Sequence, residues 1–93
     1  ARVEQYVVRQ QQRRHISFAD GIDDYQLNSQ SVRHLGLLYS TFAPGSSSGD
    51  SPYTHDGEEA GYVVSGRLEL WIDGAATTLA AGDSFSFPSS SPH

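Results

Sequence analysis

Two histidines and one carboxylate occur at spacings that would allow a small β-structure to bring them together at one point. His55 and Glu59 are four residues apart at the start of an expected strand, and His93 follows a second expected strand over residues 82–88. Two imidazoles and one carboxylate, with positions left open on the ion, form the ligand set of non-haem iron sites, and zinc, nickel and manganese accept the same donors. The residue types therefore predict a divalent metal site at these three residues and leave the identity of the metal open.

Glu59 needs a strand register that turns it inward. A two-residue turn at Ser65 and Gly66 would pair Glu59 with Ile72 in a hairpin. Because side chains alternate along a strand, this register places Glu59 on one face with six other residues, namely Gly61, Val63, Leu68, Leu70, Ile72 and Leu79. A carboxylate on such an apolar face is costly unless it is paired, protonated or bound to a cation. Gly61 is expected to leave room beside Glu59 for a metal and its ligand.

The two motifs that contain these residues resemble the signature motifs of the cupin superfamily of small β-barrels. The first is the His-x3-Glu-x6-Gly pattern within residues 53–66, and the second is the Gly-x5-Pro-x4-His pattern of residues 82–93. The resemblance implies an all-β fold, a cupin-type double-stranded β-helix or jelly-roll barrel, with residues 1–93 as a single domain. The first motif usually reads His-x-His, and here Tyr53 stands at the first position. The last barrel strands would follow His93, so the expected barrel is truncated at its C-terminus.

The sequence of residues 55–66 is also similar to that of the C-terminal cupin domains of helix-turn-helix bacterial transcriptional regulators. Tyrosine is an uncommon ligand for divalent metals, so we expect the Tyr53 phenol to hydrogen-bond a ligand or water in the pocket. The alternatives are that Tyr53 is a fourth metal ligand or that its ring packs on the rim of the barrel. The polar groups would orient a ligand between apolar walls. The predicted ligand-binding residues are Tyr53, Gly61, Val63, Leu70 and Phe85.

Composition limits the classes of function. The chain has 93 residues, which suits one core, and it contains no Cys, which excludes disulfides and thiolate metal sites. No apolar run is long enough for a membrane span, and no signal peptide is evident, so we expect a cytoplasmic protein. The net charge of -5 has the wrong sign for a surface that must neutralise phosphates. Any contact with nucleic acid would therefore come from a segment outside this chain.

The elements expected around the motifs are strands and turns. No segment has apolar residues at helical spacing over three turns. Strands are predicted over residues 3–9, 15–18 and 32–42, and a surface loop over residues 43–52. Asp20 and Gly21 predict a turn, and Asp73 and Gly74 predict a type I′ hairpin.

The outer face of the expected hairpin carries two large aromatic side chains. Tyr62 and Trp71 would be near-diagonal neighbours there, beside Val64 and Glu69. This is too much apolar area to leave in water, so the N-terminal strands or a second subunit should cover it. We expect a homodimer or a larger assembly.

Three classes of function fit this pattern. The first is a sensory domain of a bacterial transcriptional regulator, which binds a small polar metabolite with or without a divalent metal. The second is a metal-dependent enzyme, a dioxygenase or an isomerase, that uses His55, Glu59 and His93. The third is a metal-free cupin that binds a small molecule. Beyond Tyr53 no separate general acid or base stands out, so we assign no catalytic residue and expect binding without turnover.

Overall fold

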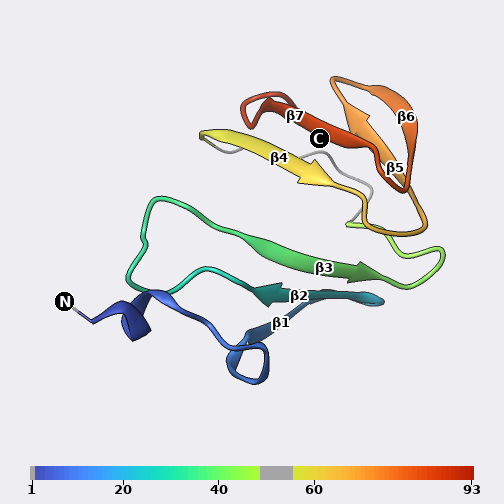
Figure 1. Ribbon diagram of the computed structural model, residues 1–93. Helices are drawn as coiled ribbons and strands as arrows, with labels where there is room; N and C mark the ends of the chain where they lie inside the picture. The colour runs from blue at the N-terminus through green and yellow to red at the C-terminus, as the bar shows by residue number, and fades with distance from the viewer. Residues whose placement is uncertain (1, 49–55) are drawn as a thin grey trace. The chain divides into compact units, whose positions relative to one another are not determined.

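The computed structural model describes residues 2–48 and 56–93, which form seven β-strands and two short 3₁₀ helices (Figure 1). The chain divides into two compact units, residues 1–50 and 51–93. Every strand pair among the described residues is antiparallel, so the fold is all-β, as the sequence predicted. Among these residues, no helix combines the length and the apolar character that crossing a bilayer requires.

The first unit begins with two 3₁₀ helices, η1 (Val3–Tyr6) and η2 (Gln10–Gln12). The backbone bonds locally in η1, where the Val7 N–H donates to the Glu4 carbonyl over 3.2 Å. The Gln5 carbonyl accepts from the Ser29 hydroxyl over 2.5 Å. These bonds use groups that a strand ladder would need, so the predicted strand over residues 3–9 is wrong.

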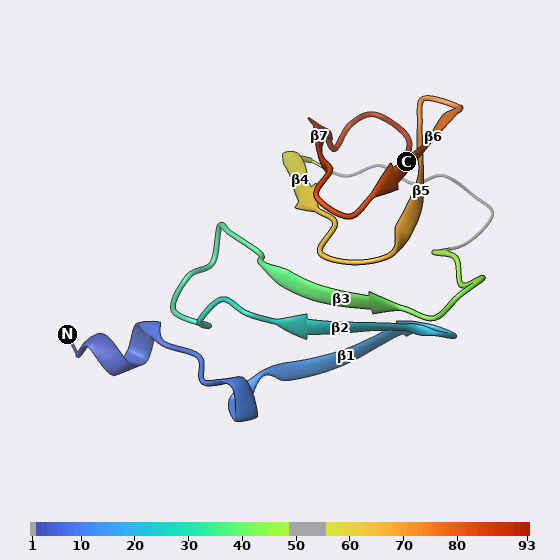
Figure 2. The same cartoon turned by 45° about the vertical axis from the view of Figure 1, so that its right-hand side comes forward.

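A three-stranded sheet follows, with the order β1-β2-β3 (Figure 2). Its strands are β1 (Arg14–Ala19), β2 (Ile22–Gln26) and β3 (Leu38–Phe42). The predicted turn at Asp20 and Gly21 joins β1 to β2, and Gly21 has a φ of 82°. The predicted strand over residues 32–42 is shorter than expected, because residues 32–37 form an irregular connection. The side chain of Asn28 holds that connection by accepting from the Leu37 N–H over 2.9 Å.

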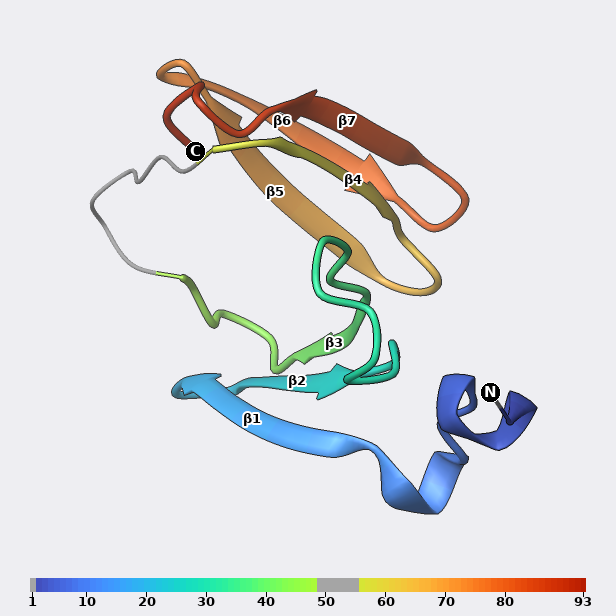
Figure 3. The ribbon, with the colours of Figure 1, turned by 90° about the vertical axis from the view of Figure 1, so that its left-hand side faces the viewer.

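The second unit contains β4 (Glu58–Tyr62), β5 (Arg67–Ile72), β6 (Ala75–Ala80) and β7 (Ser84–Pro88). Figure 3 shows its two-stranded sheets, β4 with β7 and β5 with β6. The predicted hairpin between β4 and β5 is therefore wrong. Two-residue hairpin turns need a positive φ at their first central residue, and Ser65 does not have one, although Gly66 does (78°).

The second predicted turn is confirmed. Asp73 and Gly74 have φ values of 52° and 79°, the left-handed pair that a type I′ turn requires. They connect Ile72 directly to its partner Ala75. Aspartate and glycine tolerate this backbone geometry better than most residues, which explains why this turn could be read locally.

The predicted alternation of less exposed and exposed side chains along β4 and β5 is confirmed, although the two strands belong to different sheets. In β4 and β5 each inward residue is less exposed than its neighbours, and this holds for Glu59, Gly61, Leu68, Leu70 and Ile72. Val63 continues the series as one of the buried residues. Alternation depends only on the extended backbone, so it survives a change of partner strand.

Tyr62 and Trp71 lie in different two-stranded sheets, so the predicted diagonal contact across one hairpin is wrong. Both are exposed, at 65% and 54%. The Trp71 Nε1–H donates to the Glu69 carboxylate over 2.6 Å, which satisfies the polar edge of the indole and leaves its rings uncovered.

Candidate functional site

Glu59 enters the candidate site from the middle of β4. Its neighbours Glu58 and Ala60 are exposed, whereas the Glu59 side chain is 33% exposed. Its cross-strand partner is Phe87 of β7, one of the few buried apolar residues in the described part of the chain. The pairing of β4 with β7 therefore places the Glu59 carboxylate next to the second predicted motif, which contains His93.

His93 is brought back toward β4 by a short turn after β7. The turn is closed by the Ser91 N–H, which donates to the Pro88 carbonyl over 3.0 Å. The Pro92 carbonyl accepts from the Asp73 N–H over 2.9 Å, which anchors the segment to the β5–β6 turn. The His93 side chain is only 4% exposed.

The His93 ring has a defined orientation. Its Nδ1 lies 2.7 Å from the Ser91 carbonyl oxygen, and a carbonyl oxygen only accepts, so Nδ1 carries the proton. The Phe87 ring meets the imidazole edge to face with the centroids 4.7 Å apart. These two contacts leave Nε2 directed at Glu59, whose Oε1 lies 3.3 Å away.

The facing Nε2 and Oε1 atoms restrict what the site can hold. If the imidazole is neutral, Nε2 presents a lone pair to a carboxylate that is also an acceptor, which is unfavourable without a positive charge between them. Either a second proton on His93 or a cation would supply that charge. A backbone carbonyl that accepts from Nδ1–H is also the usual support for a histidine that binds metal through Nε2.

The spacing of these two atoms fits a shared cation. Two ligands, each about 2.1 Å from one ion, lie about 3.0–3.4 Å apart at octahedral or tetrahedral angles. The Nε2–Oε1 distance of 3.3 Å falls within this range. No group of three or more His, Cys, Asp or Glu residues suited to a metal occurs within the described residues. His55 and Tyr53, the other predicted polar residues of the site, lie outside that part of the chain.

The room that we expected beside Gly61 is occupied. The Phe85 ring, from the cross-strand partner position, lies where a Cβ at residue 61 would be placed. Glycine is therefore required there for close approach of an aromatic ring, and the predicted space for a metal over Gly61 is wrong. Phe85 and Phe87 are stacked with their centroids 6.0 Å apart, so together they form an aromatic wall behind Glu59.

The remaining predicted wall residues divide between the two sheets. Val63 is buried just beyond β4, and it exchanges backbone hydrogen bonds with the β6–β7 connection, at Asp83 and Gly82, over 2.9 and 2.8 Å. Leu70 lies in the other sheet, where it faces inward from β5 opposite Thr77.

Three residues of the second motif matter more than the sequence indicated. Phe87 is the cross-strand partner of Glu59 and contacts the His93 ring, and alternation along β7 places it on the same face as Phe85, with which it was an alternative for the apolar lining. Ser91 fixes the imidazole through its backbone carbonyl, which carries no side-chain signal. Ser89 is completely buried, and its hydroxyl makes no hydrogen bond within the part of the chain that the structure describes.

Comparison with known proteins gives one family and two curated relatives. Residues 38–93, more than half of the chain, match the family described as "Cupin domain". Over 66 residues the chain is 35% identical to the HTH-type transcriptional regulator PuuR of Escherichia coli (strain K12), and the same values hold for the regulator of that name in Shigella flexneri. The match covers 71% of this chain but 35% of each regulator, so the chain spans about a third of their length. No solved structure gives a significant match.

Proposed function

The chain belongs to the family of cupin domains, and from this premise we propose that it is the effector-sensing domain of a bacterial transcriptional regulator. The similarity to part of two HTH-type regulators supports this assignment. Because the net charge of -5 does not suit contact with DNA phosphates, we propose that another segment of the regulator contacts DNA. We further propose that the protein acts in the cytoplasm as a homodimer.

The observation that carries the proposal is the Glu59–His93 pair. It places a carboxylate and an oriented imidazole 3.3 Å apart on the inward face of β4, against the buried ring of Phe87. Small-molecule sites combine such apolar walls with a few fixed polar groups. The proposed ligand is a small polar metabolite that exchanges hydrogen bonds with these two side chains.

A divalent cation fits the same pair of residues. Glu59 Oε1 and His93 Nε2 would hold it, and His55 is the proposed third ligand. When bound, zinc, iron, nickel or manganese would supply Lewis-acid polarisation of a ligand oxygen. The protein's part is to keep the His93 Nδ1–H on the Ser91 carbonyl, so that Nε2 remains the coordinating atom.

A metal-dependent dioxygenase or isomerase is the second candidate function. The orientation of His93 favours it, because a carbonyl-supported imidazole is typical of catalytic metal centres as well as of sensors. Both polar groups of the described site would be used as ligands, which leaves neither as a general base. We therefore propose that the isolated chain binds a metabolite without turning it over.

Calorimetric titration of the protein with zinc, ferrous, nickel and manganese salts tests the site. The expected result is saturable binding of at least one ion, weakened about tenfold or more by Glu59→Gln, which removes the charge and preserves the shape. Glu58→Gln is the matched control, because it changes the charge equally from the exposed face of β4. Equal losses in both variants would refute a specific role for Glu59.

A second measurement separates the sensor from the enzyme. The metal-loaded protein is incubated with small diols, diketones, amino acids and sugars, and both heat of binding and product are recorded. Binding without product supports the sensor. If product forms only with metal, and the Glu59→Gln variant forms none, the enzyme would be favoured over the sensor.

A further inference from the structure

Two consecutive arginines of the first unit project from opposite faces of its sheet. The Arg13 guanidinium lies 5.8 Å from the centroid of the Tyr39 ring, on the face that also carries Tyr25. Arg14 is the first residue of β1 and is paired with Gln26. Because extended residues alternate, Arg14 reaches the other face, where it lines a separate pocket.

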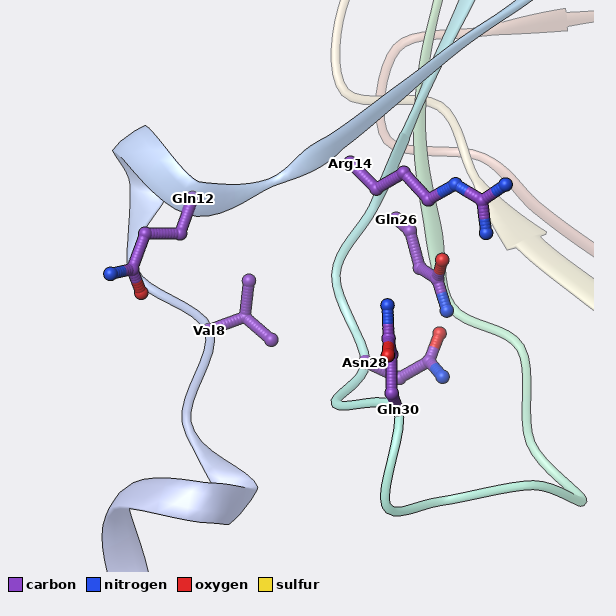
Figure 4. A pocket seen from close by; sticks show the side chains of 6 residues that line it. All are labelled: Val8, Gln12, Arg14, Gln26, Asn28 and Gln30. Carbon is purple, nitrogen blue, oxygen red and sulfur yellow. The ribbon is translucent and has the colours of Figure 1, made fainter.

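The pocket lies between the N-terminal segment and the chain beyond β2 (Figure 4). Val8 and Gln12 come from the N-terminal segment, and the facing residues are Arg14, Gln26, Asn28 and Gln30. It has a volume of about 70 Å³. That volume has room for several water molecules, and hence for a ligand of a few non-hydrogen atoms.

Hydrogen bonds hold the two walls together. The hydroxyl of Ser29, a buried residue, donates to the Gln5 carbonyl over 2.5 Å, and the Ser31 hydroxyl donates to the same oxygen over 3.4 Å. Asn28 is fixed by accepting from the Leu37 N–H and donating to the Ser29 carbonyl, over 2.9 and 3.3 Å. These bonds fix the backbone of both walls and the side chain of Asn28, which lowers the part of the entropic cost of binding that ordering them would add.

The lining is cationic and rich in hydrogen-bonding groups. Arg14 makes no ion pair with the described residues, whereas Arg9 is paired with Glu4 at 3.3 Å. No acidic residue lines the pocket. The side-chain amides of Gln26 and Gln30 likewise have no hydrogen-bond partner among the described residues. Figure 4 shows the Gln26 amide next to the guanidinium, with the amides of Asn28 and Gln30 beyond it, whereas the Gln12 amide points away from the guanidinium.

We propose that this pocket binds a small monocarboxylate, at a site separate from the Glu59–His93 pair. The guanidinium fork of Arg14 matches the two oxygens of a carboxylate, and the neighbouring amides complete its hydrogen bonding. Asp24 lies two residues along β2 on the same face, held by the Ser40 hydroxyl over 2.5 Å. Its negative charge opposes each carboxylate of a ligand, so a dicarboxylate is opposed more strongly than a monocarboxylate. The proposal is independent of the proposed effector site.

Titration of the isotope-labelled protein with sodium acetate and sodium lactate, followed by the side-chain amide signals of Gln26 and Gln30, tests this proposal. We expect saturable shifts with a dissociation constant in the millimolar range, as befits so small a ligand. Acetamide, which lacks the charge, and succinate, which adds one, should bind several-fold more weakly. Shifts that do not saturate, or equal binding of acetamide, would overturn the assignment.

Variants of the two arginines provide reciprocal controls. Arg14→Gln should weaken acetate binding about tenfold, the loss expected when a bidentate charged contact is removed. Arg13→Gln makes the same change of charge one residue away on the opposite face and should leave the affinity unchanged. Gln30→Ala, at an exposed position, should weaken binding several-fold without affecting the sheet. Equal losses in the two arginine variants would show a general charge effect and contradict the proposal.

Discussion

The Phe85 ring lies directly over the Cα of Gly61, in the space that any side chain at residue 61 would occupy. The two residues are cross-strand partners in the β4–β7 sheet. The ring also stacks with Phe87, which in turn contacts His93. A single glycine thus sets the position of the aromatic wall behind the candidate site.

Gly61→Ala is expected to destabilise the protein by about 1–3 kcal/mol, because the new methyl group must displace the Phe85 ring. Urea denaturation measures the change. Gly36→Ala is the matched control, since a Cβ there meets nothing within 4 Å and the backbone needs no positive φ. It should leave stability unchanged or raise it by up to about 1 kcal/mol. Phe85→Leu should recover part of the loss when combined with Gly61→Ala.

His93→Ala should lower the free energy of unfolding by about 1–3 kcal/mol. The substitution leaves a cavity against Phe87 and removes the hydrogen bond to the Ser91 carbonyl. His34→Ala removes the same side chain from an exposed position, where the effect should stay within about 0.5 kcal/mol. Similar values for the two variants, measured by thermal or urea unfolding, would mean that His93 does not pack as described.

Asp73→Val should destabilise the β5–β6 hairpin by about 1–2 kcal/mol, because a β-branched residue resists the φ of 52° at this position. Asp73→Asn is the control, since asparagine accepts left-handed backbone geometry. Circular dichroism during urea titration compares the two. An Asp73→Val protein as stable as Asp73→Asn would argue against the type I′ turn.

The solution mass should be twice the 10.1 kDa of the chain. Tyr62 and Trp71 are exposed at 65% and 54%, and aromatic side chains of this kind anchor protein interfaces. Sedimentation equilibrium of Trp71→Ser and Tyr62→Ser should show an about tenfold weaker dimer for at least one of them. Val3→Ser, which alters an exposed apolar residue of the first unit, is the control. A monomeric wild-type protein at micromolar concentration would contradict the prediction.

Side-chain alternation and one turn could be predicted from the sequence, whereas the pairing of the strands could not. Alternation placed Glu59 and Leu70 on the inward face correctly, because it depends only on the extended backbone. The turn at Asp73 and Gly74 could also be predicted locally, because aspartate and glycine tolerate the left-handed backbone that it requires. The pairing of β4 with β7 joins residues that are far apart in sequence. Ser65 and Gly66 suggested instead a hairpin between β4 and the next strand, β5.

The candidate site was predicted in part. The approach of His93 to Glu59 was expected from the spacing of the two motifs, and the two side chains lie 3.3 Å apart, whereas the metal site itself stays a prediction. The role of Ser91 was not predictable, because a backbone carbonyl acts there and any residue type would supply one. The filling of the space over Gly61 also escaped prediction, since it depends on which strand supplies the opposing side chain.

The Asp73 N–H donates a hydrogen bond to the Pro92 carbonyl, so exchange of this amide with solvent deuterium reports whether the C-terminal segment is docked. Most protected amides of a hairpin exchange with solvent deuterium when the hairpin itself opens. The Asp73 amide lies outside that ladder, and its protection lasts only while the residues around His93 stay docked. Its exchange rate therefore follows the opening and closing of the candidate site rather than the unfolding of the β5–β6 sheet.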